Sequence, residues 1–208
     1  MSTIINADTS AGLKLTSDTS GEIKLQSAGA DIATVSSTGL AMASGKTLTG
    51  DAVVTGKILQ VVQNTKTDTF SSTSTLPSTT EVTGGNATIT PSSSSSKVLV
   101  MISGAFGVSA NNYAVALQLK RGTTLITVGD QRGSETRASA GSPVDGTGWA
   151  QNFNITFLDS PSTTSATTYK LFLGVESGAT SMIGGSYASG GTYNMSVPTN
   201  IVLMEVAG

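Results

Sequence analysis

Hydrophobic and polar residues alternate along most of the chain, which is the pattern of β-strands with one buried face. The alternation is clearest over residues 113–119, 153–157 and 169–175. We predict further strands at Ile58–Val62, Thr67–Ser71, Ala87–Pro91, Lys97–Phe106, Leu125–Val128, Thr180–Ala188 and Ile201–Val206. Turn-forming residues separate these runs, and no helical pattern lies between them. This spacing is typical of an antiparallel sandwich or jelly roll.

The alternation also predicts which side chains form the core. The buried set should comprise Leu117, Leu119, Phe153, Ile155, Phe157, Leu171 and Leu173, whereas Gln118 and Lys120 should face solvent. Two runs, Val98–Ile102 and Ile201–Met204, are continuously apolar, so both of their faces should be buried. In a small sandwich, we expect a neighbouring subunit to cover the second face.

The first 56 residues follow a shorter pattern. The units Gly12–Leu15 and Gly21–Leu25 share an alternating signature, with looser repeats at Gly39–Met42 and Gly45–Leu48. Each unit has one apolar face and no helix to cover it, so we expect identical chains to bury these faces together. We therefore predict a short-strand β stalk at 1–56, stable only as an oligomer, and a head domain at 57–208. The alternative is an unstructured tail.

Composition narrows the functional classes. Only 12% of residues are charged, against roughly 25% in average soluble domains. Ser, Thr and Gly together fill about two-fifths of the chain, yet 38% of residues are hydrophobic, which argues against disorder. The chain contains no Cys and no His, so disulfides, Ser-His-Asp catalysis and the common zinc sites are excluded.

Charge and hydropathy also limit the expected partners. The 11 basic residues are scattered, so we expect no nucleic-acid partner. No run of 18 apolar residues is present, so we expect no membrane insertion. Residues 1–20 lack the features of a signal peptide, which favours synthesis in a cytoplasm.

One polar cluster lies in the Gly-rich segment 129–141. It contains Asp130, Arg132, Glu135 and Arg137, whose guanidinium and carboxylate groups could recognise sugar hydroxyls or phosphates. The alternatives are a solvated loop and an ion-pair network between subunits. No spacing typical of metal ligands is present. The sequence contains 13 acidic residues, but their positions do not identify a pair of catalytic carboxylates. We therefore expect no enzyme activity, no metal and no cofactor.

Aromatic residues offer a second candidate. Trp149 is the only tryptophan and follows a polar loop that contains Asp145; Tyr187 lies in another Gly-rich loop. These rings could stack on a sugar, although core or interface packing is the commoner fate of a Trp that opens a strand. With the polar cluster, these three residues complete a predicted recognition set of seven.

Several segments resemble proteins of tailed bacteriophages. They are Gly12–Ile23, Leu59–Phe70, the turn Lys120–Gly122, Leu158–Tyr169 and Ile201–Val206. They are similar to segments of phage fibre and appendage proteins, a group that includes tail fibres, head fibres and capsid decorations. The resemblance implies a homotrimer with a C-terminal jelly roll of the tumour-necrosis-factor and complement type.

These observations together predict a non-enzymatic structural protein of a tailed-phage virion. Its N-terminal region should dock on capsid or tail proteins, and its head should serve host adhesion, with a cell-surface glycan as a candidate partner, or capsid decoration. The alternative from another class is a carbohydrate-binding module or accessory subunit of a cellular enzyme.

Overall fold

The computed structural model describes residues 22–46 and 58–208, and these residues form strands, turns and loops without a helix. The chain divides into two compact units, Met1–Val54 and Thr55–Gly208. The unit Gly12–Leu15 and half of Gly45–Leu48 lie outside the described residues. No helix long and apolar enough to cross a membrane occurs in the part of the chain that the structure describes.

The first unit contains a three-stranded antiparallel sheet in the order β1-β2-β3. Its strands are β1 (Ile23–Ser27), β2 (Ala30–Ser36) and β3 (Gly39–Met42). The sequence analysis identified the first and third strands but not the second. The glycines at 29 and 39 adopt positive φ angles of 78° and 122° in the turns, a conformation that glycine reaches without steric cost.

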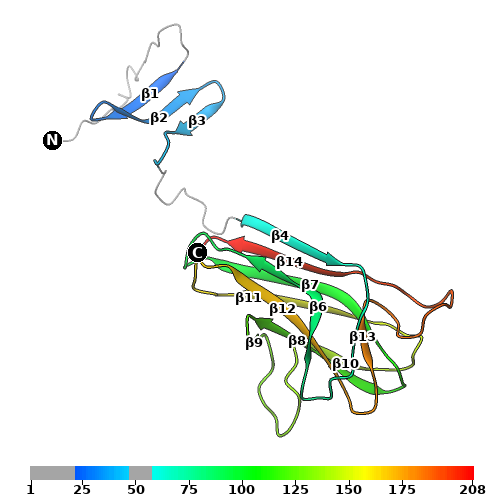
Figure 1. The fold of residues 1–208 in the computed structure, drawn as a ribbon. Coiled ribbons are helices and arrows are strands. Elements are labelled where there is room, and N and C mark those ends of the chain that lie inside the picture. Colours follow the sequence, from blue (N-terminus) through cyan, green and yellow to red (C-terminus); the bar gives the residue numbers. More distant parts are fainter. Residues whose placement is uncertain (1–21, 47–57) are drawn as a thin grey trace, which may run out of the picture. The chain divides into compact units, whose positions relative to one another are not determined.

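The second unit is a sandwich of two antiparallel sheets (Figure 1). One sheet contains β6 (Thr80–Ile89), β8 (Tyr113–Arg121), β9 (Thr124–Ile126), β10 (Ala140–Val144) and β12 (Thr167–Val175). The other contains β4 (Ile58–Lys66), β5 (Phe70–Ser72), β7 (Lys97–Val108), β11 (Gln151–Asp159), β13 (Ser181–Ile183) and β14 (Thr199–Val206). The main strands follow the orders β6-β12-β8-β10 and β4-β14-β7-β11. This interleaving of eight strands between two sheets is a jelly roll, as predicted.

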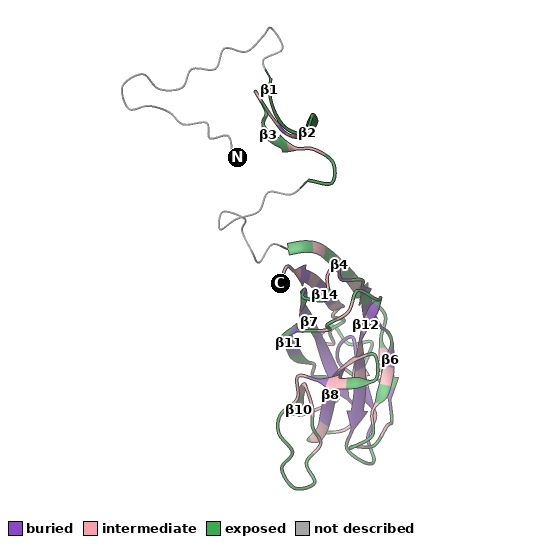
Figure 2. Cartoon of the chain, turned by 90° about the vertical axis from the view of Figure 1, so that its left-hand side faces the viewer, coloured by how far each residue is buried: buried purple, intermediate pink, exposed green. Residues whose placement is uncertain are grey.

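The core lies between the two sheets, and Figure 2 shows the buried residues concentrated in the strands of the sandwich. Six of the seven predicted core residues are buried, and Phe157 is partly buried against the same cluster. The predicted phase of these strands is therefore confirmed. The predicted exposure of Gln118 is wrong, because this side chain is only 7% exposed.

The two continuous apolar runs are not buried on both faces within one chain. In β7, Val98, Val100 and Ile102 face the core, whereas Met101 on the opposite face is 39% exposed. The run in β14 alternates in the same way between buried and half-buried residues. Among the described residues, these outer faces stay exposed or half-buried.

The loops of the sandwich gather at two ends, which the strand directions define. The chain enters β4 at Ile58, opposite Val206 near the C-terminus, and the loop 90–96 leads into β7 at this same end. We call this the proximal end. The loops 109–112, 145–150, 176–180 and 184–198 lie at the other end, which we call the distal end.

Candidate functional site

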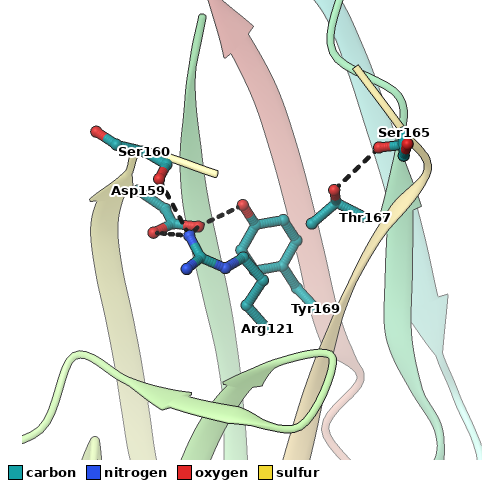
Figure 3. Close-up of polar contacts among 6 residues, drawn as sticks. All are labelled: Arg121, Asp159, Ser160, Ser165, Thr167 and Tyr169. Atoms are coloured by element: carbon teal, nitrogen blue, oxygen red, sulfur yellow. Dashed lines mark hydrogen bonds and ion pairs between the residues drawn. The ribbon is translucent and has the colours of Figure 1, made fainter. Parts of the chain in front are cut away.

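A buried polar network joins the two sheets at the proximal end (Figure 3). Asp159 ends β11, and both of its carboxylate oxygens accept hydrogen bonds from one guanidinium nitrogen of Arg121, at 2.9 and 2.8 Å. The hydroxyl of Tyr169 donates to the same carboxylate at 2.7 Å. Burial, and then the bond to Asp159, raise the pKa of Tyr169 well above its usual value, so it remains a neutral donor.

This network accounts for two of the segments that resemble phage proteins. Arg121 belongs to the turn Lys120–Gly122, and Asp159 and Tyr169 lie near the ends of the segment Leu158–Tyr169. The bonds connect β8 and β12 of one sheet with β11 of the other. Their role is thus structural: they hold the sheets together where the loop 160–166 crosses between them.

The four residues of the predicted polar cluster lie together on one wall of a groove. The groove encloses about 1200 Å³ on the outer face of the five-stranded sheet, and Asp130, Arg132, Glu135 and Arg137 line it. Leu76 lines it as well, and small residues of β8 and β10, such as Ala116 and Gly141, are cross-strand partners in its floor. The sequence prediction that these charges share one site is consistent with this placement.

Two of these charges are already paired with each other. The guanidinium of Arg132 donates two hydrogen bonds to the carboxylate of Glu135, at 3.0 and 2.9 Å, and both side chains are largely exposed. The Nε of Arg137 donates to the carbonyl of Gly129 at 2.8 Å, which closes the loop on itself. The wall therefore presents balanced charge, which does not select strongly for an anion.

Gln118 explains why the loop stays on the sheet. It lies on the outer face of β8, where its Nε2 donates to the carbonyl of Arg137 at 2.8 Å and its Oε1 accepts from Thr79 at 2.9 Å. These two partners cover the side chain. Strand alternation placed Gln118 correctly on the outer face, but it carries no information on the loop that buries that face.

The other three predicted recognition residues lie elsewhere, in the loops of the distal end. Asp145 and Trp149 belong to the loop 145–150, and Tyr187 belongs to the loop 184–198. A hydrogen bond from the amide of Ala188 to the carbonyl of Thr147, at 2.7 Å, joins these two loops. The predicted set of seven therefore forms two separate sites, with four residues at the groove and three at the distal end.

Trp149 is exposed rather than packed in the core. Its side chain is 70% exposed, and an edge of its indole lies against the backbone of Gly146. Tyr193 in the neighbouring loop is 91% exposed, and Met195 is 64% exposed. Sequence reasoning left these last two out of the predicted set. The available signal was the density of Tyr, Ser, Gly and Asn in 184–196, a composition typical of recognition loops.

The outer face of the six-stranded sheet carries no charge over three cross-strand rows, which we call the neutral face. The first row is apolar, the second is mixed and the third is polar. Its members are Val61, Met204, Leu99 and Leu158; Gln63, Val202, Met101 and Thr156; and Thr65, Asn200, Ser103 and Asn154. Solvated sheet faces ordinarily carry charged side chains, so this composition is typical of a surface that meets another protein.

The three-stranded sheet has a wholly apolar face, which we call the apolar face of the first unit. Cross-strand pairing aligns Ile23, Val35 and Leu40 in one row and Leu25, Ala33 and Met42 in the next. Four of the six side chains are more than a third exposed. The opposite face carries Lys24 and Asp31, whose charged atoms lie 3.5 Å apart. A sheet this small, over whose apolar face residues 22–46 place no second layer, is marginal by itself.

No group of three or more His, Cys, Asp or Glu side chains that could hold a metal occurs among residues 22–46 and 58–208. Among the described carboxyl groups, Glu205 has the most strongly shifted pKa, and its side chain is fully buried. Burial raises its pKa, but hydrogen bonds from Ser92 and Gln60 outweigh burial and lower the pKa to about 2.

Comparison with known proteins does not assign a family. No family model and no curated protein sequence matches the chain. Solved structures of infectious bursal disease virus are similar in part. The chain of the T13 particle has 12% identity and a TM-score of 0.38, and that of the T=1 particle has 14% identity and a TM-score of 0.37. Each alignment covers 81% of this chain but 43% of the viral chain, so this chain spans less than half of their length.

Proposed function

We propose that the chain is a non-enzymatic structural protein of a tailed-phage virion, a trimeric fibre or appendage whose β head serves host adhesion or capsid decoration. The observation that carries this proposal is the apolar face of the first unit. All six of its side chains are apolar and four of them are more than a third exposed, so copies of the same sheet are its natural partner. The resemblance to phage fibre segments is the reason for proposing three copies and a location in the virion.

The neutral face of the head supports association at a second place. Three of its large apolar side chains, Val61, Met101 and Leu158, are between 39% and 56% exposed. Because the face has no charges, a second copy can pack on it without desolvating an ion. A chain that contacts its copies through both units would associate more tightly than through either unit alone.

Oligomeric state tests this first part directly. Light scattering on the full chain should give three times the chain mass of 20.9 kDa. Leu25→Lys, on the apolar face of the first unit, should weaken or abolish the trimer. Thr34→Lys is the matched control, since Thr34 lies on the opposite face of the same sheet and should leave the mass unchanged. A folded monomer of the unaltered chain at micromolar concentration would contradict the proposal.

Particle composition tests the second part. A mass-spectrometric inventory of purified virions should contain the chain, and its copy number should distinguish a capsid decoration from a few trimeric fibres. A chain lacking residues 1–56 should no longer enter particles, because the N-terminal region is proposed to dock on capsid or tail proteins. Incorporation of the truncated chain would refute this division of labour.

A second function is favoured by the exposed aromatic side chains of the distal end. Trp149 and Tyr193 would suit a carbohydrate-binding module or accessory subunit of a cellular enzyme. That function predicts that the chain copurifies with a catalytic subunit and is absent from virions. The same particle inventory therefore separates the two proposals.

A further inference from the structure

All exposed aromatic side chains of the protein gather in one place. Trp149, Tyr187 and Tyr193 are the only aromatic residues that are more than a third exposed among the described ones, and the remaining segments contain no aromatic residue. All three lie in the loops 145–150 and 184–198 at the distal end, which the hydrogen bond between Ala188 and Thr147 joins. Exposed aromatic clusters on loops over a rigid scaffold mark binding sites.

The loop that carries two of these rings is held in shape by its own hydrogen bonds. The amide of Ser186 donates to the carbonyl of Met195 at 3.0 Å, and its hydroxyl accepts from the amide of Met195 at 2.8 Å. Asn194 caps the tip, because its Oδ1 accepts from the amide of Gly191 at 2.9 Å. A loop fixed in this way loses little conformational entropy when it binds.

The chemistry around the rings selects the class of ligand. No charged residue occurs between Glu176 and Glu205, and the other loop carries a single charge at Asp145. A cavity of about 310 Å³ lies within the Gly-rich loop, and Ser186, Tyr187 and Asn194 are among the residues that line it. The site thus offers flat apolar rings beside hydroxyl and amide groups, without a cation for an anionic ligand.

We propose that the distal end binds a neutral glycan, with pyranose rings stacked on Trp149 and Tyr193 and sugar hydroxyls bonded to the polar groups of the loop 184–198. The faces of pyranose rings carry C–H groups that pack on aromatic rings, and their edges carry hydroxyls that amides and hydroxyls can bind. The charged groove around Arg132 and Arg137 is then not the sugar site. This inference rests on the proposed adhesive function and names the ligand class for it.

The test uses the full-length chain on an array that displays neutral and anionic glycans of bacterial surfaces, followed by titration with each neutral oligosaccharide bound. Because Trp149 is the only tryptophan, its fluorescence reports the site directly: binding should shift the emission to shorter wavelength and protect it from acrylamide quenching. Tyr187→Ala and Tyr193→Ala should each weaken binding roughly threefold to tenfold while they keep the reporter.

The matched control is the double variant Arg132→Ala with Arg137→Ala, which changes the groove and should leave glycan affinity unaltered. Binding to anionic glycans alone, binding to no glycan, or equal loss in the groove variant would overturn the inference. So would a fluorescence shift with phosphatidylcholine vesicles in place of glycans, since the rings would then serve a membrane surface. If the chain is present in virions and binds no neutral glycan, only this inference fails; if it is absent from virions, the proposed function fails.

Discussion

Removing the hydroxyl of Tyr169 should weaken the head domain measurably. Tyr169 is fully buried, and its hydroxyl donates at 2.7 Å to the buried carboxylate of Asp159. Tyr169→Phe keeps the ring in the core and deletes only this bond. Hydrogen bonds to charged groups contribute about 1.5–3 kcal/mol, and the ion pair with Arg121 still holds Asp159 in place.

This loss should lower the melting temperature by about 3 to 12 °C for a unit of this size. Scanning calorimetry at a fixed protein concentration is the suitable assay, because oligomers melt at concentration-dependent temperatures. Tyr193→Phe is the matched control: it deletes the same atom from a ring that is 91% exposed and should leave the melting temperature unchanged. Equal melting temperatures for the two variants would refute the structural role of the network.

Three further changes test other parts of the fold. Because hydrogen bonds hold the pKa of Glu205 at about 2, below its usual 4.5, the ionised group stabilises the fold above pH 4.5 and this contribution disappears as the pH falls towards 2. Urea midpoints at pH 5 and pH 2.5 should therefore differ more in the unaltered chain than in Glu205→Gln, and equal differences would contradict the assignment. Gln118→Ala should lower the free energy of unfolding by about 1–3 kcal/mol, because it leaves Thr79 and the carbonyl of Arg137 without their hydrogen-bond partner. Lys120→Ala should cost less. Denaturant titrations that rank the two variants in reverse would contradict the role of Gln118 in holding the loop. Leu171→Ala should cost about 2–5 kcal/mol. Lys170→Ala, on the opposite face of the same strand, should cost far less in thermal melts, because it removes only a part-exposed ion pair. This contrast vanishes if the strand phase is wrong.

The alternation of apolar and polar residues determined the strands and most of the core. Leu117 and Leu119, or Phe153 and Ile155, share a face because successive side chains of a strand point to opposite sides, and this holds whatever the neighbours are. The predicted bounds were short in β6 and β14, and there the sequence analysis did not assign which residues face inward. Strand β10 was missed because Gly141 and Pro143 reduce its strand signal, although an edge strand tolerates proline.

Contacts between distant segments were decided only by the tertiary structure. The polar cluster of 129–141 could be located from sequence because its members are close together in the chain. Trp149 and Tyr193 are 44 positions apart, and they share an end of the sandwich because β10 runs antiparallel to β8 and because the loops 145–150 and 184–198 bond to each other. Gln118 is buried for a similar reason, since a loop 19 residues away folds over its face. A period of two residues records which side of a strand faces inward, but not which loop lies over the other side.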